Sequence, residues 1–177
     1  AVRLALFRGF DGFSYADLAA EVGITKASIH HHFASKATLA AALMQRYNSD
    51  FEAACAEIEQ QQSTGAERLS ALIARYQSAL EGGKSLCLCV SFSTSTESLS
   101  AETTAQMSHF RSMMTDWLAK TFCQGRDDGT IQNVADPLGE AAATLPLLEG
   151  AQLAARVAQD THRFTAAVQL LSTRLHT

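Results

Sequence analysis

The sequence predicts an all-α protein of about nine helices. Apolar residues recur every three to four positions through most of the chain, which is the period of an α-helix. Alanine is abundant, β-branched runs are few, and only two prolines occur in 177 residues. A hydrophobic content of 47% is enough to form a substantial core, which excludes a disordered chain.

The chain carries no sequence signal for export or for a membrane. No apolar run approaches the roughly 20 residues of a membrane span, and no signal peptide opens the sequence. The first residues, AVRLALFRGF, have the pattern of a helix already under way, so we expect further chain before them. A cytoplasmic location is therefore expected, with Cys55, Cys87, Cys89 and Cys123 as free thiols that do not repeat at a zinc-finger spacing.

The charge of the chain is divided unevenly along its length. The net charge is −4, which by itself argues against nucleic acid as a partner. Residues 1–48, however, hold five basic and three acidic residues, a net charge of +2, whereas the remainder carries −6. This asymmetry is typical of a protein in which only the N-terminal part meets phosphate.

Residues 1 to about 46 contain the start and stop signals of short, closely spaced helices. Val2, Leu6 and Phe10 mark one face of the first helix. Ser14 is a good N-cap for a second helix, with Asp17 as its capping-box acid, and Gly23 ends it. In the second helix Leu18, Ala19 and Val22 are expected to be buried, and Ile24 to anchor the following turn.

A third, short helix follows, and then a longer fourth one. Thr25 caps the third helix, which runs to about Phe33 and turns Ile29 inward. Ser35 caps the fourth helix. Two short helices joined through an Ala-x-x-x-Gly turn form a helix-turn-helix pattern, which here reads LAAEVGITKASIHHHF over residues 18–33.

This head resembles that of the TetR family of bacterial repressors. The matching residues, in the family's order and spacing, are Leu6-Phe7, Gly9-Phe10, Leu18-Ala19, Gly23-Ile24, His32-Phe33 and Ser35-Lys36. The resemblance implies a DNA-binding helix-turn-helix domain at residues 1–46. It also implies a ligand-binding and dimerisation domain at residues 47–177, where the helices resemble the family only in pattern.

The candidate DNA contacts lie on and around the third helix. Its N-terminal half enters the major groove first, so base reading is expected from Thr25, Lys26, Ala27 and Ser28. Lys26 can reach a guanine edge or pair with a phosphate, and a solvated surface lysine is the alternative. The resemblance implies phosphate contacts at Tyr15 and Lys36, while Ala16 stands where some relatives carry a base-reading arginine.

Three consecutive histidines follow, and they do not form a metal site. Successive helix residues project about 100° apart, so His30, His31 and His32 face three directions, and no metal is expected. The resemblance implies that His30 replaces a tyrosine that usually contacts phosphate and that His31 lies near the sugar–phosphate backbone. It gives His32 a structural role within the head.

The remaining chain predicts further helices. A stripe of Leu69, Leu72, Ile73, Tyr76 and Leu80 marks one that ends at Gly82-Gly83. A second starts near Leu86, Ser100 caps a long one that stops around Gly125, and Asp136-Pro137 begins the next. The last shows apolar residues at heptad-like spacing.

Two nearly continuous apolar helices at the C-terminus exceed what one small core needs. In the family such helices pair with their copies as a four-helix dimer interface, and a purely intramolecular bundle is the alternative. The interface candidates are Leu148, Ala151, Ala154, Val157, Phe164, Val168 and Leu171. Dimerisation would place two heads one or two DNA turns apart on a palindrome.

The body is expected to sense an inducer. Candidate walls of a ligand pocket are Tyr76, Phe92, Phe110, Met113, Met114 and Trp117, although residues of these types at helical spacing also form ordinary cores. The segment SLCLCVSFSTSTESLS resembles the branch of the family that senses electrophiles such as N-ethylmaleimide through a cysteine, and Cys87 is the matching position. A helix N-terminus lowers the pKa of a thiol. The alternative is that Cys87 and Cys89 are small buried hydrophobes.

The sequence thus predicts a homodimeric, TetR-like transcriptional repressor without a cofactor. A small molecule or thiol modification would release it from a palindromic DNA operator, and no membrane is expected as a partner. The chain contains no Gly-x-Ser-x-Gly, Walker, Rossmann or HExxH motif, which argues against an enzyme. A TetR-fold ligand-binding or interaction module that has lost specific DNA binding is the remaining alternative.

Overall fold

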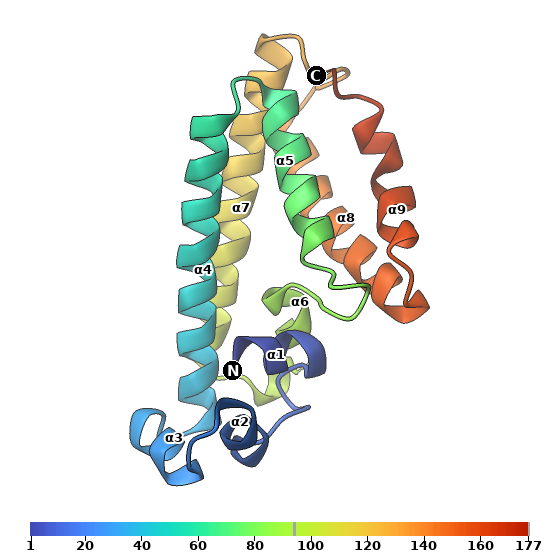
Figure 1. The fold of residues 1–177 in the computed structure, drawn as a ribbon. Coiled ribbons are helices and arrows are strands. Elements are labelled where there is room, and N and C mark those ends of the chain that lie inside the picture. The colour runs from blue at the N-terminus through green and yellow to red at the C-terminus, as the bar shows by residue number, and fades with distance from the viewer. Residues whose placement is uncertain (94, 177) are drawn as a thin grey trace. The chain divides into compact units, whose positions relative to one another are not determined.

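A computed structural model describes residues 1–93 and 95–176. Within these residues the chain forms nine α-helices and one short 3-10 helix (Figure 1). An isolated antiparallel β-bridge pairs Ile131 with Leu175. The helices are α1 Val2–Arg8, α2 Tyr15–Val22, α3 Lys26–His32, α4 Lys36–Gln61, α5 Gly65–Ser78, α6 Leu88–Ser93, α7 Ala101–Asp127, α8 Pro137–Ala158 and α9 His162–Ser172, with the 3-10 helix η1 at Thr96–Ser98. The all-α class is confirmed.

The helix starts follow the capping residues in the sequence. Each predicted cap accepts a hydrogen bond from a backbone N–H two or three residues further on, at 3.1 to 3.3 Å. These hydrogen bonds satisfy amides that have no partner within the first turn of a helix. The capping residues are Ser14, Thr25, Ser35, Ser100 and Asp136.

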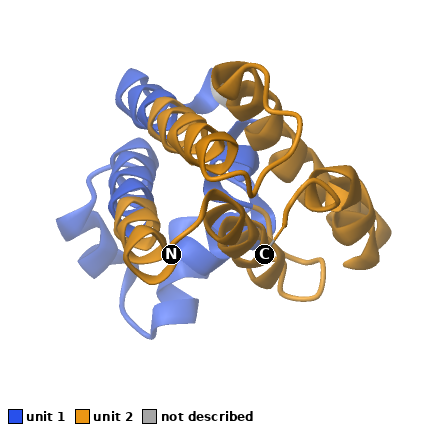
Figure 2. Cartoon of the chain, turned by 90° about the horizontal axis from the view of Figure 1, so that it is seen from above, with its two compact units in different colours: residues 1–50, 87–110 blue, residues 51–86, 111–177 orange. Residues whose placement is uncertain are grey.

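The helices pack into two compact units that do not follow chain order. One unit contains residues 1–50 and 87–110, and the other contains residues 51–86 and 111–177 (Figure 2). Helices α4 and α7 each contribute residues to both units. The predicted domain boundary near residue 46 concerns function and stays a prediction, because a packing unit can include segments that are distant in sequence.

In the first unit α1 packs on α6. The rings of Phe10 and Phe92 meet edge to face with centroids 5.7 Å apart, and the Ser91 hydroxyl donates to the Leu6 carbonyl at 3.3 Å. Gly9 ends α1 with a φ of 73°, and a Cβ there would lie only 3.3 Å from the Ser91 carbonyl oxygen. A glycine is therefore needed both for the backbone conformation and for the close approach.

Helices α4 and α7 are also joined within the first unit. The rings of Tyr47 and Phe110 lie 5.3 Å apart, and Phe110 is fully buried. The Asn48 side chain donates to both the backbone and the side-chain carbonyl of Gln106, at 3.1 and 2.8 Å. This pair anchors α4 to the start of α7.

The core of the second unit is built from α5, α8 and α9 with parts of α4 and α7. Helices α8 and α9 lie side by side, and α5 packs against both (Figure 1). The Gln152 side chain donates to the Tyr76 carbonyl at 3.1 Å, and Arg111 forms an ion pair of 3.0 Å with Glu149. Burial raises the pKa of the Glu149 carboxyl, and the guanidinium of Arg111 opposes that shift.

Gly125 lies inside α7, which continues to Asp127, two residues beyond the predicted end. A close contact in the second unit explains why this position holds a glycine. A Cβ at Gly125 would overlap the side chain of Ile131, and a Cβ at Gly65 would overlap the backbone of Gly125. These glycines therefore mark where the start of α5 and the end of α7 touch.

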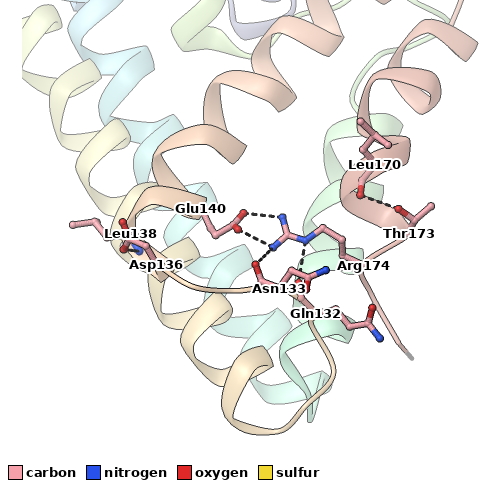
Figure 3. Close-up of polar contacts among 8 residues, drawn as sticks. All are labelled: Gln132, Asn133, Asp136, Leu138, Glu140, Leu170, Thr173 and Arg174. Carbon is pink, nitrogen blue, oxygen red and sulfur yellow. Dashed lines mark hydrogen bonds and ion pairs between the residues drawn. The ribbon is translucent and has the colours of Figure 1, made fainter.

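The C-terminal end of α9 is held by one arginine. Arg174 forms a two-fold ion pair with the carboxylate of Glu140, at 2.9 and 2.8 Å, and also donates to the carbonyls of Gln132 and Asn133 at 3.0 and 3.1 Å (Figure 3). Backbone hydrogen bonds between residues 130–132 and 174–176 run beside it. The chain after α9 is thus fastened to the segment that precedes α8.

The predicted dimer contacts differ in how far they are exposed in the single chain. Five of the candidates have at most 5% of their surface exposed in the single chain, so their side chains already belong to its core: Leu148, Ala151, Phe164, Val168 and Leu171. Among the candidates, Ala154 is exposed and Val157 is 86% exposed. The apolar pattern identified the helices correctly but mostly marked their inward faces.

Candidate nucleic-acid interface

The interface begins at the N-terminus of α2. Ser14 and Asp17 form a complete capping box, in which the Ser14 amide donates to the Asp17 carboxylate at 2.8 Å and Asp17 donates back through its amide. The Ser14 hydroxyl also donates to this carboxylate, and this hydrogen bond, followed by the one from the Ser14 amide, lowers the pKa of Asp17. An exposed ion pair of 3.4 Å joins Arg8 to the same carboxylate. The Asp17 side chain is therefore occupied by contacts that fix the start of α2.

A tight turn then sets α3 against α2. Gly23 adopts the left-handed conformation, with a φ of 76°, and its N–H donates to the Ala19 carbonyl at 2.9 Å. This is the turn that the Ala-x-x-x-Gly pattern predicts. Val22 and Ile24, expected to be inward, are 52% and 43% exposed, because the turn is short and α3 covers only part of α2.

Helix α3 turns one residue inward and presents the rest. Ile29 is 3% exposed, whereas Lys26, Ala27 and Ser28 are exposed. Since successive residues are about 100° apart, His31 lies opposite Ile29 on the outer face. The predicted reading surface is thus accessible in the first unit.

Tyr15 connects α2 to the end of α3. Its hydroxyl donates to the Phe33 carbonyl at 3.0 Å, and its ring meets that of His30 edge to face at 4.7 Å. Burial raises the pKa of the phenol, which keeps it in the donor form at neutral pH. The hydroxyl is therefore already used to position α3.

Lys36 is the first residue of α4, and its ammonium group lies against two aromatic rings. Its ammonium group lies 4.8 Å from the ring centre of Phe10 and 4.5 Å from that of Phe13, and it donates a short hydrogen bond to the Phe13 carbonyl. Desolvation lowers the pKa of this amine, while the charges of Asp11 and Asp17 oppose the shift. The cation thus holds the loop between α1 and α2 while keeping its charge near the surface.

These elements border a wide-open surface cavity of about 300 Å³ in the head. It is lined by Phe13, Ser14, Tyr15, Lys26, His30 and Lys36. Four of the predicted DNA contacts are therefore brought together at one site from α2, α3 and α4. Two ammonium groups and an imidazole beside a helix N-terminus make this site suitable for an anion.

Two cavity residues were not predicted as contacts. Ser14 was identified as a cap, and its place at the start of α2 is the signal that could have added it. Phe13 has no such signal, because its contribution depends on the packing of Lys36 across the loop. Thr25 and Ser28 also hydrogen-bond each other through their hydroxyls at 2.9 Å, so their side chains have a structural role in addition to the predicted one.

The predicted pocket residues fall in both units. Phe92 and Phe110 are fully buried in the first unit. In the second unit Tyr76, Met114 and Trp117 are at most 7% exposed, while Met113 is half-buried. The Trp117 Nε1 atom is buried without a hydrogen-bond partner. Their role as pocket walls stays a prediction.

The four thiols differ in environment. Cys55, Cys87 and Cys89 are buried, whereas Cys123 is partly exposed. The Cys87 sulfur accepts a hydrogen bond from the Val90 amide at 3.4 Å, which places it at the N-terminus of α6 as predicted. Burial, with the nearby charges of Glu59 and Glu52 as smaller contributions, raises the pKa of Cys55 to about 11.

The described residues contain neither a candidate metal site nor a candidate membrane-spanning helix. In residues 1–93 and 95–176, no group of three or more His, Cys, Asp or Glu side chains is arranged to hold a metal ion. Over the same residues, no helix combines the length and apolar character needed to cross a bilayer.

The head has the geometry of a helix-turn-helix DNA-binding protein. Residues 1–43 match the family described as "Bacterial regulatory proteins, tetR family". A TetR-family transcriptional regulator from Agrobacterium tumefaciens has a structure similar to the chain, with a TM-score of 0.92 and 28% identity over 99% of this chain and 93% of that one. The family match over the head and the structural similarity over nearly the whole chain identify the protein as a TetR-family transcriptional regulator, which confirms the predicted family.

Two further relatives have names that state a function. The HTH-type transcriptional repressor NemR of Escherichia coli strain K12 is 26% identical over 89% of this chain and 81% of its own length. The structure of AibR in complex with isovaleryl coenzyme A and operator DNA is similar at a TM-score of 0.65 and 25% identity, over 86% of this chain and 81% of that one. The family consists of regulators, in agreement with the expectation that the protein is not an enzyme.

Proposed function

We propose that the protein is a homodimeric repressor that leaves a palindromic operator when its body is changed by a small molecule or by modification of a thiol. The cationic cavity of the head is the observation that carries this proposal, because it gathers Tyr15, Lys26, His30 and Lys36 next to the exposed face of α3. A phosphate seated there would place α3 along the major groove.

Within this proposal the contacts divide by type. Lys36 and His30 line the cavity and act on the phosphate backbone, which fixes the position of the head. Tyr15 lines the same cavity and orients α3 through its hydrogen bond to the Phe33 carbonyl. Lys26 and Ala27 occupy the first turn of α3 and read base edges together with Thr25 and Ser28. His31 lies on the outer face, within reach of the sugar–phosphate backbone. His32 packs edge to face on His31 at 5.3 Å and keeps a structural role.

Alanine substitution of the two lysines separates these roles. We expect Lys36→Ala to weaken binding to every DNA sequence and to reduce the slope of log affinity against log salt by about 0.9 per phosphate contact. Lys26→Ala should in addition change which sequences bind best, at a cost of about 1–3 kcal/mol per head on the preferred site. Fluorescence anisotropy on duplexes selected from a random library measures both effects.

Matched variants make this test decisive. Lys120→Ala removes an exposed lysine of α7 and should leave binding unchanged. Lys36→Arg keeps a positive charge near the rings of Phe10 and Phe13. Thermal melting of Lys36→Ala and Lys36→Arg then shows whether a loss of affinity comes from a lost DNA contact or from lower stability. If Lys26→Ala lost the same affinity on every DNA sequence, Lys26 would have no role in reading bases. Failure of the native protein to select any duplex would favour a module that has lost specific DNA binding.

An exposed, uncharged face of α8 supports the dimer. The residues along its centre lie opposite the buried face and are exposed: Gly139, Pro146, Gly150, Leu153 and Val157. Alanines 142, 143 and 154 flank this line, and Leu170 of the neighbouring α9 is 81% exposed. Small and apolar residues let two helices approach closely, so this face is suited to a second copy of α8.

Release by a small molecule would use the second unit. AibR has been crystallised with both a small molecule and operator DNA, which supports the same pairing of ligands here. The single tryptophan, Trp117, is 7% exposed on α7 and has an unsatisfied indole N–H, so it is a candidate ligand contact and a fluorescence probe for inducer screening. Movement of α4, which begins at Lys36 and continues into the second unit, would change the separation of the two heads.

Release by thiol modification would use Cys87. Its sulfur faces the first turn of α6, where the Val90 amide favours a thiolate. Because only 4% of Cys87 is exposed, reaction requires a local opening of this segment. The similarity to the repressor NemR supports the assignment to a repressor of this branch.

N-Ethylmaleimide should therefore label the thiols in a fixed order. We expect rapid modification of Cys123, the partly exposed thiol, with no loss of operator binding, followed by slower modification of Cys87 that coincides with release. Cys123→Ser should abolish the fast phase alone, and Cys87→Ser should prevent release. Mass spectrometry of digested samples assigns each phase. Retention of full operator affinity after complete labelling of Cys87 would exclude thiol sensing.

A further inference from the structure

His30 is the one of the three consecutive histidines that lines the cationic cavity of the head. It follows Lys26 by one helical turn, so both side chains project from the same flank of α3. Its ring is held edge to face on Tyr15, at 4.7 Å and an interplanar angle of 66°. His30 thus lines the cavity beside the Tyr15 ring, together with Lys26 and Lys36.

The charged groups around the cavity favour the binding of an anion. Helix α3 contributes Lys26 and no acid, and α4 contributes Lys36. Of the acids on α2, Asp17 is engaged by Ser14 and Arg8, and Glu21 pairs with Arg3 at 3.8 Å. Asp11, in the loop before α2, acts on Lys36. Tyr15 remains neutral because burial raises its pKa.

Among the groups that line this cavity, imidazole is the type whose charge changes between about pH 5 and 8. A phosphate oxygen within a few ångströms favours the protonated form of a histidine, which can then donate a charge-assisted hydrogen bond. Lys26 and Lys36 line the same cavity and bring two further cationic side chains to it.

We propose that His30 contacts a DNA phosphate as an imidazolium, so that binding of each head to the operator is coupled to proton uptake from solution. This inference rests on the proposed DNA-binding function and adds the uptake of a proton to the equilibrium between the head and the operator. Operator affinity then rises as the pH falls. A shift of one unit in the histidine pKa on binding corresponds to about a tenfold change in affinity per head.

The other two histidines provide an internal comparison. His31 lies on the outer face of α3, opposite Ile29, and His32 lies on the flank away from Lys26. Neither lines the cavity described above. Proton uptake through the cavity therefore depends on position 30 and not on the number of histidines in α3.

The experiment uses the full chain and a duplex of about 30 base pairs selected by the native protein from a random library. Affinity is measured by fluorescence anisotropy between about pH 6 and pH 8 at constant ionic strength. Calorimetry in two buffers of different ionisation enthalpy counts the protons taken up. The variants are His30→Gln, His30→Tyr and His31→Gln, with His162→Gln as a matched control on the exposed surface of α9.

The native protein and His162→Gln should bind several-fold more tightly per head at the lower pH, with a fraction of a proton taken up per head. His30→Gln and His30→Tyr should bind with an affinity independent of pH, and tyrosine should still donate to phosphate. Circular dichroism checks that His30→Gln and His30→Tyr keep their fold. In the folded variants, loss of proton uptake is the result that supports the proposal.

Two results would overturn the inference. One is a native protein that binds the selected duplex with no pH dependence. The other is a pH dependence that survives in His30→Gln or disappears only in His31→Gln. If the native protein selects no duplex at any pH, the proposed DNA-binding function itself fails, which is a different outcome.

Discussion

Replacing Leu153 and Val157 together by glutamate should convert the protein to monomers and lower its operator affinity by at least about 100-fold, because linked binding sites gain about 10²–10⁴ in affinity over separate ones. Both side chains are exposed, at 41% and 86%, so the substitutions add charge to the proposed interface without removing core contacts. Two copies of α8 would then bring carboxylates together in a face that otherwise carries small and apolar residues.

Light scattering and anisotropy on the selected duplex measure the two effects on the same samples. Ser112→Glu adds the same charge at an exposed position of α7 and should leave the dimer intact. Thermal unfolding should remain cooperative in the double variant, since its core is unchanged. A double variant that stays dimeric would show that this face of α8 is not the interface.

Gly65→Ala should destabilise the protein by about 3 kcal/mol, the upper end of the usual cost of overpacking. The added Cβ would overlap the backbone of Gly125 and lie 2.8 Å from the Thr121 carbonyl oxygen. Backbone atoms of α7 cannot move aside as a flexible side chain can. In an open helix the same substitution would stabilise by about 1 kcal/mol, so the contact reverses the sign.

Urea unfolding followed by the fluorescence of Trp117 measures this loss. The matched control is Gly150→Ala in the monomeric Leu153→Glu, Val157→Glu background, where that face of α8 is open to solvent. A Cβ at Gly150 meets no atom within 4 Å, so this variant should be more stable by about 1 kcal/mol. Equal stabilisation by both substitutions would contradict the close approach of α5 and α7.

The helix starts and the reading head could be predicted because their signals are local. Ser14 with Asp17, and Thr25 with Ser28, are recognisable in sequence since a cap bonds to amides two or three residues away. Gly23 was identifiable for a similar reason, as the turn between two short helices needs a left-handed residue. The cavity residues Tyr15, Lys26, His30 and Lys36 followed from the same head.

The sequence could not reveal which apolar residues of α8 face inward. Alanine, leucine and glycine occur all around this helix, so its pattern gives no clear polar side from which to infer the buried one. Leu148 and Ala151 are consequently core residues, while Leu153 and Val157 are on the surface. Only the positions of α5 and α9 decide between these faces.

Contacts between distant segments were likewise decided by the tertiary structure. Gly125 was expected to lie near the end of a helix, but only the structure shows that Gly65 and Ile131 approach it too closely for a Cβ. Phe13 entered the site through its contact with Lys36, 23 residues away. Arg174 binds Glu140 across 34 residues, a pairing that no spacing rule predicts.

The sequence by itself determined the helices, their caps and the DNA-reading head, because each of these depends on interactions within a few residues. The tertiary structure decided which faces are buried, where glycines permit close packing, and which of the three histidines joins the two lysines. These depend on how separate helices meet, and helix packing depends on side chains that are far apart in the chain.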